Sequence, residues 1–289
     1  MNKLTALFSL VSFIISCGGV SDISTNYIFD EGMEVTSPKT QIEISVEKKP
    51  HTVSGDFYSL SNKGSGWGFV KKKGQEPEIY ASTQEMFARN GTYYIDPNRT
   101  KKIYLTFDEG YENGYTAQIL DVLAEYKVPA AFFITGDYME NETELIDRMV
   151  AEGHIVGNHT WNHPNLHKLS DPQKIADELG RLNDAFYERY QRNMYYMRPP
   201  EGEYSERVLA VADSLGYKTM LWSFAYKDWD TKAQRGADYA FNQVTPYLHD
   251  GAVLLLHAVS RDNTEALPRI IEYARSAGYE FAGLDMMGR

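Results

Sequence analysis

Five apolar segments of this chain each lead to a polar residue suited to chemistry. The polar residues are Asp108, His159, Arg198, Asp228 and His257. Segments with helical periodicity lie between them, so strand and helix patterns alternate over about 150 residues. This alternation predicts a (β/α) barrel, because the carboxyl ends of parallel strands meet at one rim and carry the functional residues there.

The apolar segments predict seven strands, near residues 102–108, 130–136, 154–159, 194–199, 218–223, 252–257 and 279–284. Helices are expected between them, at 115–126, 141–152, 172–191, 205–215, 238–248 and 265–277. Gly153, Gly216 and Gly278 follow three of these helices, as is typical of the glycine that ends a helix. The pattern by itself does not distinguish seven strands from eight.

Two of the polar segments contain possible metal ligands. The sequence TFDEG at 106–110 ends a strand on two adjacent carboxylates, and HTWNH at 159–163 places two histidines four residues apart. Pro164 limits the histidine segment to about one helical turn. Imidazoles and carboxylates together hold divalent ions, and a spare carboxylate can activate water, so the two segments predict a hydrolytic metal site. A solvated strand end and the polar face of an ordinary helix are the competing interpretations.

Five ordered motifs resemble those of the polysaccharide deacetylase family, also called the NodB-homology or carbohydrate esterase 4 family. They are TFDEG (106–110), HTWNH (159–163), RPP (198–200), DW (228–229) and LLLH (254–257). The surrounding residues, with GWGF at 66–69, are most similar to the sporulation branch that acts on N-acetylmuramic acid in peptidoglycan. The resemblance covers roughly residues 60–289. It implies an α/β fold, a distorted (β/α)7 barrel with an N-terminal extension.

The resemblance also implies catalytic roles for four residues. Asp108 is expected to act as the general base, with Arg198 keeping it ionised and oriented. His257 is expected to protonate the leaving amine, and Asp228 favours its protonated form. Each residue also has an ordinary structural interpretation, such as an ion pair for Arg198 or a buried core histidine for His257.

A divalent metal, with zinc as the expected ion, is implied at His159, His163 and Glu109. Most of the family carries aspartate where this chain has Glu109, and the sporulation branch commonly has asparagine. The extra methylene of glutamate shifts the carboxylate, so ligation by Glu109 requires a compensating backbone position.

Five further residues are expected to contact the substrate. The backbone N–H of Glu201, just past Pro200, is the expected donor to the tetrahedral oxyanion. Tyr111 and Trp229 are candidates for stacking on sugar rings, and Trp229 is also expected to limit water access to the acid. Arg261 is the expected partner of the lactyl carboxylate of muramic acid.

The expected reaction is metal-assisted removal of N-acetyl groups from peptidoglycan, most specifically from N-acetylmuramic acid, giving muramic δ-lactam in spore cortex. Two alternatives remain at this point. The first is a deacetylase of N-acetylglucosamine in peptidoglycan or chitin-like polymers, or of acetylxylan. The second, from another class, is a non-catalytic carbohydrate-binding lipoprotein.

The N-terminus predicts export. A lysine at position 3, an apolar run from Leu4 to Ile15 and small residues around Cys17 are typical of a signal peptide. The sequence before Cys17 also resembles a lipobox, so we expect a lipoprotein signal at 1–16 and a lipid anchor on Cys17, the only cysteine. An unlipidated cysteine in an ordinary signal peptide is the alternative. The enzyme is then expected at the outer face of the bacterial cytoplasmic membrane, in the cell envelope.

Three parts should follow the signal: a flexible tether at 17–56, a pre-barrel segment at 57–98 and the deacetylase domain at 99–289. The formal net charge of −11 argues against nucleic acid as a partner, because phosphate binding requires a basic face. Peptidoglycan glycan strands and the membrane are the expected partners.

Overall fold

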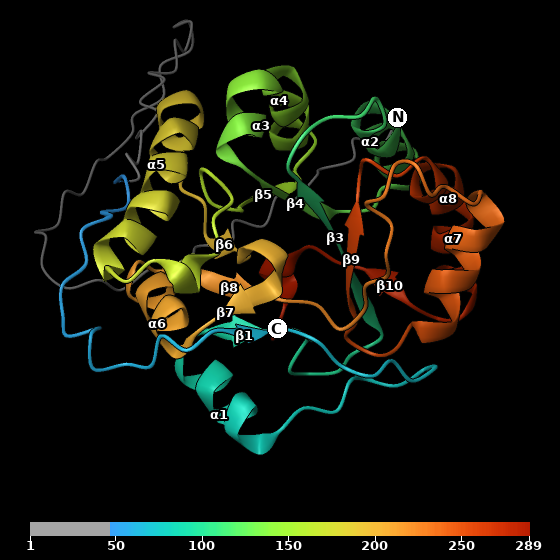
Figure 1. The fold of residues 1–289 in the computed structure, drawn as a ribbon. Helices are drawn as coiled ribbons and strands as arrows, with labels where there is room; N and C mark the ends of the chain where they lie inside the picture. The colour runs from blue at the N-terminus through green and yellow to red at the C-terminus, as the bar shows by residue number, and fades with distance from the viewer. Residues whose placement is uncertain (1–46) are drawn as a thin grey trace, which may run out of the picture. The chain divides into compact units, whose positions relative to one another are not determined.

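Strand β3 (Lys102–Glu109) is the central strand of the fold (Figure 1). The computed structural model describes residues 47–289. In this part of the chain β3 pairs in parallel with β4 (Ala130–Ile134) and with β9 (Val253–His257). Seven of its eight residues are buried, because helices cover one face and the other face lines the inside of the curled sheet. A strand buried on both faces has the nearly continuous apolar sequence seen here.

The other strands extend this sheet. They are β5 (Ile155–Asn158), β6 (Tyr196–Met197), β8 (Lys218–Met220) and β2 (Thr92–Tyr93) on the β4 side, with β10 (Glu280–Phe281) beside the start of β3. Just after β8, Phe224 forms a parallel bridge with Leu254 of β9, which joins the two sides of the curl. All seven predicted strands are present, and the distorted β/α barrel is confirmed. A separate antiparallel pair consists of β1 (Ser65–Gly66) and β7 (Glu203–Tyr204).

Within the described residues, helices surround the strands (Figure 1). They are α2 (Thr116–Tyr126), α3 (Gly136–Asn141), α4 (Thr143–Ala151), α5 (Pro172–Tyr190), α6 (Glu206–Ser214), α7 (Ala237–Val244) and α8 (Arg261–Ser276). The helix predicted at 141–152 is α4, and the short helix α3 before it was not predicted. Helix α8 begins four residues earlier than predicted, because the Ser260 side chain accepts a hydrogen bond from the Asn263 N–H and caps the helix there.

Short turns and one further helix complete the described elements. The 3-10 turns are η1 (Leu166–Lys168), η2 (Pro200–Gly202), η3 (Thr245–Tyr247) and η4 (Leu284–Met286). Helix α1 (Ala81–Arg89) lies in the pre-barrel segment. Among residues 47–289 no helix is long and apolar enough to cross a membrane.

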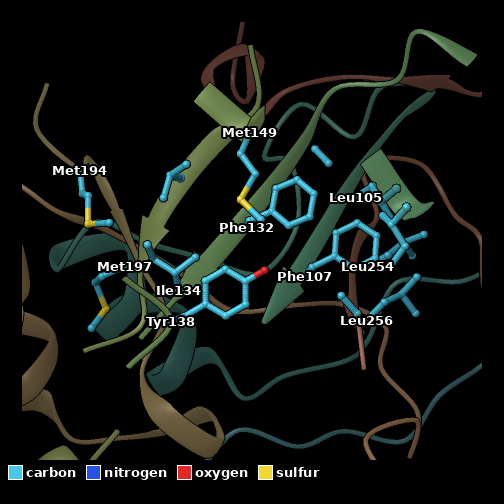
Figure 2. Close-up of a cluster of buried hydrophobic side chains, with 14 of the residues drawn as sticks. Leu105, Phe107, Phe132, Ile134, Tyr138, Met149, Met194, Met197, Leu254 and Leu256 are labelled. Carbon is cyan, nitrogen blue, oxygen red and sulfur yellow. The ribbon is translucent and has the colours of Figure 1, made fainter. Parts of the chain in front are cut away.

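The main core lies between the sheet and its helices. Figure 2 shows the ring of Phe107 between the ring of Phe132 and the side chains of Leu254 and Leu256. The two phenylalanine rings stack with centroids 5.1 Å apart. Because side chains alternate along a strand, Thr106 and Asp108 point to the opposite face from Phe107, into the curl. The packing that fixes β3 therefore also fixes the direction of Asp108.

The pre-barrel segment packs on the barrel, as predicted. Trp67 and Phe87 are buried in one cluster with Leu221, which follows β8. The indole N–H of Trp67 donates to the Trp222 carbonyl at 2.8 Å. Phe69 packs beside Trp67 with ring centroids 5.5 Å apart. This segment is therefore part of the catalytic unit.

The predicted tether is shorter than expected at its C-terminal side. Residues 47–56 belong to the same unit as the barrel, and two chain segments hold them there. The Lys49 N–H donates to Asn193 Oδ1 at 2.9 Å, and the Val53 N–H donates to Gln173 Oε1 at 3.2 Å. Gly180 of α5 leaves room for His51, since a Cβ at this position would lie 2.2 Å from the His51 Cβ. The predicted signal peptide, Cys17 and tether residues 17–46 lie outside the described residues.

Candidate active site

Asp108 and Arg198 form a buried ion pair at the rim of the barrel. Arg198 Nη1 donates to Asp108 Oδ1 at 2.7 Å, and the Arg198 side chain is fully buried. The guanidinium also donates to Thr106 Oγ1 at 2.9 Å, to the Met220 carbonyl at 2.8 Å and to the Leu221 carbonyl at 3.4 Å. Burial raises the pKa of Asp108, but the charges of Arg198 and of neighbouring histidines outweigh it and hold this pKa below the ordinary value. Asp108 is therefore an ionised carboxylate available as a base.

His257 and Asp228 form a second pair beside the first. His257 is the register partner of Asp108 on the neighbouring strand, so both side chains enter the curl at one level. His257 Nδ1 lies 2.7 Å from Asp228 Oδ1, and the His257 N–H donates to Asp228 Oδ2 at 2.9 Å. Burial lowers the pKa of His257, but the charge and hydrogen bond of Asp228 have the larger combined effect and raise this pKa above the ordinary value. His257 is therefore suited to act as an acid.

The two motif histidines lie in a loop rather than in the predicted helical turn. Thr160 and His163 both have left-handed backbone conformations, with φ of 70° and 54°. Pro164 disfavours the right-handed helical conformation at His163, which explains why the turn does not form. The imidazole centroids of His159 and His163 are nevertheless 4.9 Å apart. The loop thus brings together the two side chains that the sequence pairs.

The surroundings of His159 keep its imidazole neutral and oriented, as a metal ligand requires. Its Nδ1 lies 2.8 Å from the Arg198 carbonyl, which accepts the Nδ1 proton and leaves Nε2 with a lone pair. Nε2 lies 3.6 Å from Asp108 Oδ2. Burial lowers the pKa of His159 to about 4, so the ring is neutral at physiological pH. An oriented neutral imidazole is the form that binds metal.

Glu109 does not join these histidines. It follows Asp108 on β3 and so points to the opposite face, towards the layer of helices that contains Tyr138. Its side chain is fully buried, and neither carboxyl oxygen has a hydrogen-bond partner. Burial, with the nearby charges of Glu112 and Asp108, raises the pKa of Glu109 well above the ordinary value. A protonated carboxyl on the far face does not fit the predicted role of metal ligand.

His159 and His163 suit a divalent metal, but the arrangement of the described residues supplies no third protein ligand. Both imidazoles line the same cavity as Asp108. Within residues 47–289, no group of three or more His, Cys, Asp or Glu side chains has the arrangement of a metal site. The two histidines are therefore the protein ligands that the structure supports.

Two cavities meet at these catalytic side chains. The first has a volume of about 790 Å³ and the second of about 640 Å³. Both are lined by Asp108, His159, His163, Trp229 and His257. A cleft of this size accommodates a sugar with its substituents.

The predicted substrate residues divide between the cavities. Tyr111 lines the first, Glu201 lines the second and Trp229 lines both, with its ring centroid 5.5 Å from that of His257. Glu201 follows the buried Pro200 and has a left-handed backbone conformation, with φ of 59°. The use of its N–H as an oxyanion donor stays a prediction.

Arg261 lines neither cavity, contrary to its predicted role. It is the first residue of α8, and its side chain is near Asp262 at 3.7 Å and Glu265 at 3.9 Å. These carboxylates on the same helix draw the guanidinium along the surface of α8. The lactyl carboxylate of a substrate in either cavity would need another partner.

Three supporting residues were not identified from the sequence. Thr106 Oγ1 accepts from Arg198, and Asn263 Nδ2 donates to Asp228 Oδ2 at 2.6 Å. Glu178 of α5 accepts from the Asn162 N–H at 2.8 Å and so holds the histidine loop. The serine three residues before Asn263 is an N-cap signal that could have placed Asn263 in the first turn of α8.

An ionised carboxylate and a protonated imidazole that face one cavity are the base and the acid required to hydrolyse an amide or an ester. The site thus defines a hydrolase on a β/α barrel. The sequence profile described as polysaccharide deacetylase matches residues 96–220.

Individual relatives show the similarity to polysaccharide deacetylases over more of the chain. The peptidoglycan-N-acetylmuramic acid deacetylase PdaA of Bacillus subtilis is 40% identical over 229 residues, which is 78% of this chain and 87% of PdaA. The solved PdaA structure matches with a TM-score of 0.76 and covers 79% of this chain and 98% of that one.

Two other relatives are also similar. A family 4 carbohydrate esterase from Bacillus anthracis has a TM-score of 0.66 and 40% identity, over 79% of this chain and 98% of that one. A peptidoglycan-N-acetylglucosamine deacetylase from Bacillus cereus is 34% identical over 64% of this chain and 87% of its own length. The chain therefore belongs to the polysaccharide deacetylase family, carbohydrate esterase family 4. It is a deacetylase of that family, whose members are generally metalloenzymes.

Proposed function

We propose that this enzyme removes the acetyl group from N-acetylmuramic acid in peptidoglycan, and that muramic δ-lactam in spore cortex is the end product. The observation that carries the proposal is the pairing of Asp108 with Arg198 directly beside His257 with Asp228, at the same level of adjacent strands. Similarity to PdaA over most of both chains supports muramic acid as the sugar.

The proposed reaction hydrolyses the amide bond of the acetyl group. Asp108 takes a proton from water, whose oxygen attacks the acetyl carbonyl carbon. The Glu201 N–H is the proposed donor to the developing oxyanion. His159 and His163 would hold a divalent ion, zinc in our proposal, which would supply Lewis-acid polarisation of the carbonyl and a lowered pKa of water.

His257 completes the reaction at the leaving group. It donates a proton to the sugar nitrogen as the C–N bond breaks, which gives acetate and a free amine. Asp228 holds the other ring nitrogen and stabilises the charged imidazole before transfer. Trp229 lies against His257 and limits its contact with solvent. The amine and the lactyl carboxyl of the same sugar can then condense to the lactam.

Mass spectrometry of glycan strands, with and without stem peptides, tests the proposal. Metal-free protein and protein resupplied with zinc are compared. We expect acetyl loss from muramic acid only when metal is present. Loss from glucosamine alone would support the second function, which the 34% identity to the Bacillus cereus glucosamine deacetylase favours. A lack of any reaction would leave carbohydrate binding as the remaining function.

We also propose export and a lipid anchor on Cys17, which would place the enzyme against its polymer at the outer face of the cytoplasmic membrane. The apolar run before Cys17 supports this proposal. Labelled palmitate should be incorporated into the wild-type protein and not into Cys17→Ser. Equal labelling of both proteins would exclude the anchor.

A further inference from the structure

The two cavities that meet at Asp108 differ in charge. The first is lined by Asp137 and Glu140 and by no lysine or arginine. The second is lined by Glu201 and by Lys227. Among the described residues, Lys227 is the only lysine or arginine that lines either cavity. Apart from the catalytic His257, which lines both cavities, Lys227 is therefore the one cationic side chain of the described residues that a negatively charged substituent can meet there, and it lies on the side of the second cavity.

Muramic acid carries such a substituent next to the reacting group. Its N-acetyl group is on C2, and its lactyl ether, which ends in a carboxylate, is on C3. Glucosamine has a plain hydroxyl at C3. When the acetyl group is held against Asp108 and His257, the lactyl carboxylate lies only a few bonds away.

The backbone around Lys227 is fixed by its two neighbours. Tyr226 is buried, and its hydroxyl donates to Asn263 Oδ1. Asp228 is buried against His257. The chain at Lys227 is thus anchored to the acid pair, so the distance from Lys227 to the reacting centre is set by the same residues that orient His257.

The ammonium group itself can change partner. Lys227 Nζ lies 3.1 Å from Asp230 Oδ2, and 64% of the lysine side chain is exposed. Exposed ion pairs of this kind contribute little to stability, so a ligand carboxylate can replace Asp230 with little loss.

We propose that Lys227 binds the lactyl carboxylate and sets the preference for muramic acid over glucosamine. The proposal rests on the proposed function and assigns to Lys227 the contact that the sequence predicted for Arg261.

The test compares variants on two substrates, a peptide-free glycan strand that contains N-acetylmuramic acid and an oligomer of N-acetylglucosamine. Lys227→Ala should lower kcat/KM on the muramic strand about tenfold or more, mainly through KM, because one charge-assisted hydrogen bond is lost. Its activity on the glucosamine oligomer should stay within about twofold. Lys227→Arg should keep most of the preference, since it retains the charge.

Two further variants serve as matched controls. Lys232→Ala removes an exposed lysine that belongs to the same loop but lines neither cavity. Activity on both substrates should be unchanged in this variant. Asp230→Asn removes the resting partner of Lys227, so the preference for muramic acid should persist or increase.

The outcomes separate this proposal from the proposed function. If the wild type acts on muramic acid but Lys227→Ala loses activity equally on both substrates, or loses none, the role of Lys227 alone would be overturned. Wild-type activity on glucosamine alone would overturn the muramic assignment, and the role of Lys227 with it. Selective loss on muramic acid supports both.

Discussion

Opposite pKa shifts in two neighbouring residues create the acid and the base of this site. Arg198 lies within hydrogen-bond distance of Asp108 and favours its charged form, while Asp228 does the same for His257. Burial acts against charge in both cases, and the partner outweighs it in both. The partners therefore determine the pH range in which both catalytic groups are in the required state.

Asp228→Asn should move the loss of activity on the alkaline side to lower pH. His257 is active as an acid only while protonated, so activity falls as pH rises through its pKa. Without the Asp228 charge, burial dominates and lowers that pKa. A pH profile of kcat/KM measures the shift. Asp121→Asn, on an exposed part of α2, is the control that should leave the profile in place.

Glu109→Gln should stabilise the protein at pH 8 and have little effect near pH 4. The folded state holds Glu109 protonated, whereas the unfolded chain ionises it near the ordinary pKa of 4.5. Its contribution to stability is fully present below that value and is lost as pH rises towards the raised folded pKa. We expect a gain of about 1–3 kcal/mol at pH 8, measured by urea unfolding.

The same variant also tests metal binding. Zinc affinity should be unchanged in Glu109→Gln, since this side chain faces away from His159. A large loss of zinc affinity would show that Glu109 is a ligand after all. Glu85→Gln, on exposed α1, provides a stability control.

At the scale of elements, the histidine loop owes its shape to α5. Both oxygens of the Glu178 side chain accept hydrogen bonds from Asn162, from its N–H at 2.8 Å and from its Nδ2 at 2.6 Å. The Trp161 N–H donates to the Glu178 carbonyl at 3.1 Å. Trp161 also packs under Arg181 of α5, 3.9 Å from its ring centroid. A loop with two left-handed residues keeps its geometry because the helix holds its centre.

Glu178→Ala should weaken zinc binding by about tenfold or more, because residues that support metal ligands commonly contribute this much. Titration against a zinc-binding dye measures the change. Glu178→Gln keeps an acceptor for one of the two hydrogen bonds and should recover part of the affinity. Glu188→Ala, exposed on the same helix, should bind zinc like the wild type. Equal affinity in Glu178→Ala and the wild type would remove Glu178 from the support of this loop.

The elements that the sequence predicted best are those that continuous apolar runs define. Strand β3 and the position of Asp108 at its end follow from such a run, and so does His257 at the end of β9. The helical turn at 159–163 was wrong because the spacing of two histidines is compatible with a loop as well as with a helix. Glu178 and Lys227 could not be predicted, since their roles depend on contacts between segments far apart in the chain.

At the scale of the whole described unit, residues 47–56 hold two distant segments together. The Gln173 side chain donates to the His51 carbonyl at 2.8 Å, and the Asn193 side chain donates to the Glu47 carbonyl at 2.7 Å. With the two bonds donated by Lys49 and Val53, this segment connects the start of α5 with the residues before β6.

A chain that begins at residue 57 should therefore be less stable than one that begins at residue 47. The loss of these four hydrogen bonds, together with that from Lys49 Nζ to the Gly216 carbonyl, predicts a decrease of about 2–7 kcal/mol in the free energy of unfolding. Urea unfolding followed by circular dichroism measures it. A chain that begins at residue 47 and carries Lys48→Ala, which loses an ion pair with Asp184, should change by less than about 1 kcal/mol. Equal stability of the two truncated chains would contradict the prediction.

The burial of the pair formed by Asp108 and Arg198 also limits how this chain can evolve. Replacing either partner alone leaves a buried charge without its counterion, which typically costs about 3–5 kcal/mol and is a large part of the stability of a domain. In a lineage in which selection for catalysis is relaxed, selection for stability would still act against each single substitution. The base and its arginine are thus expected to be lost together or not at all, while exposed residues such as Lys227 are free to drift one at a time and to change the preferred sugar.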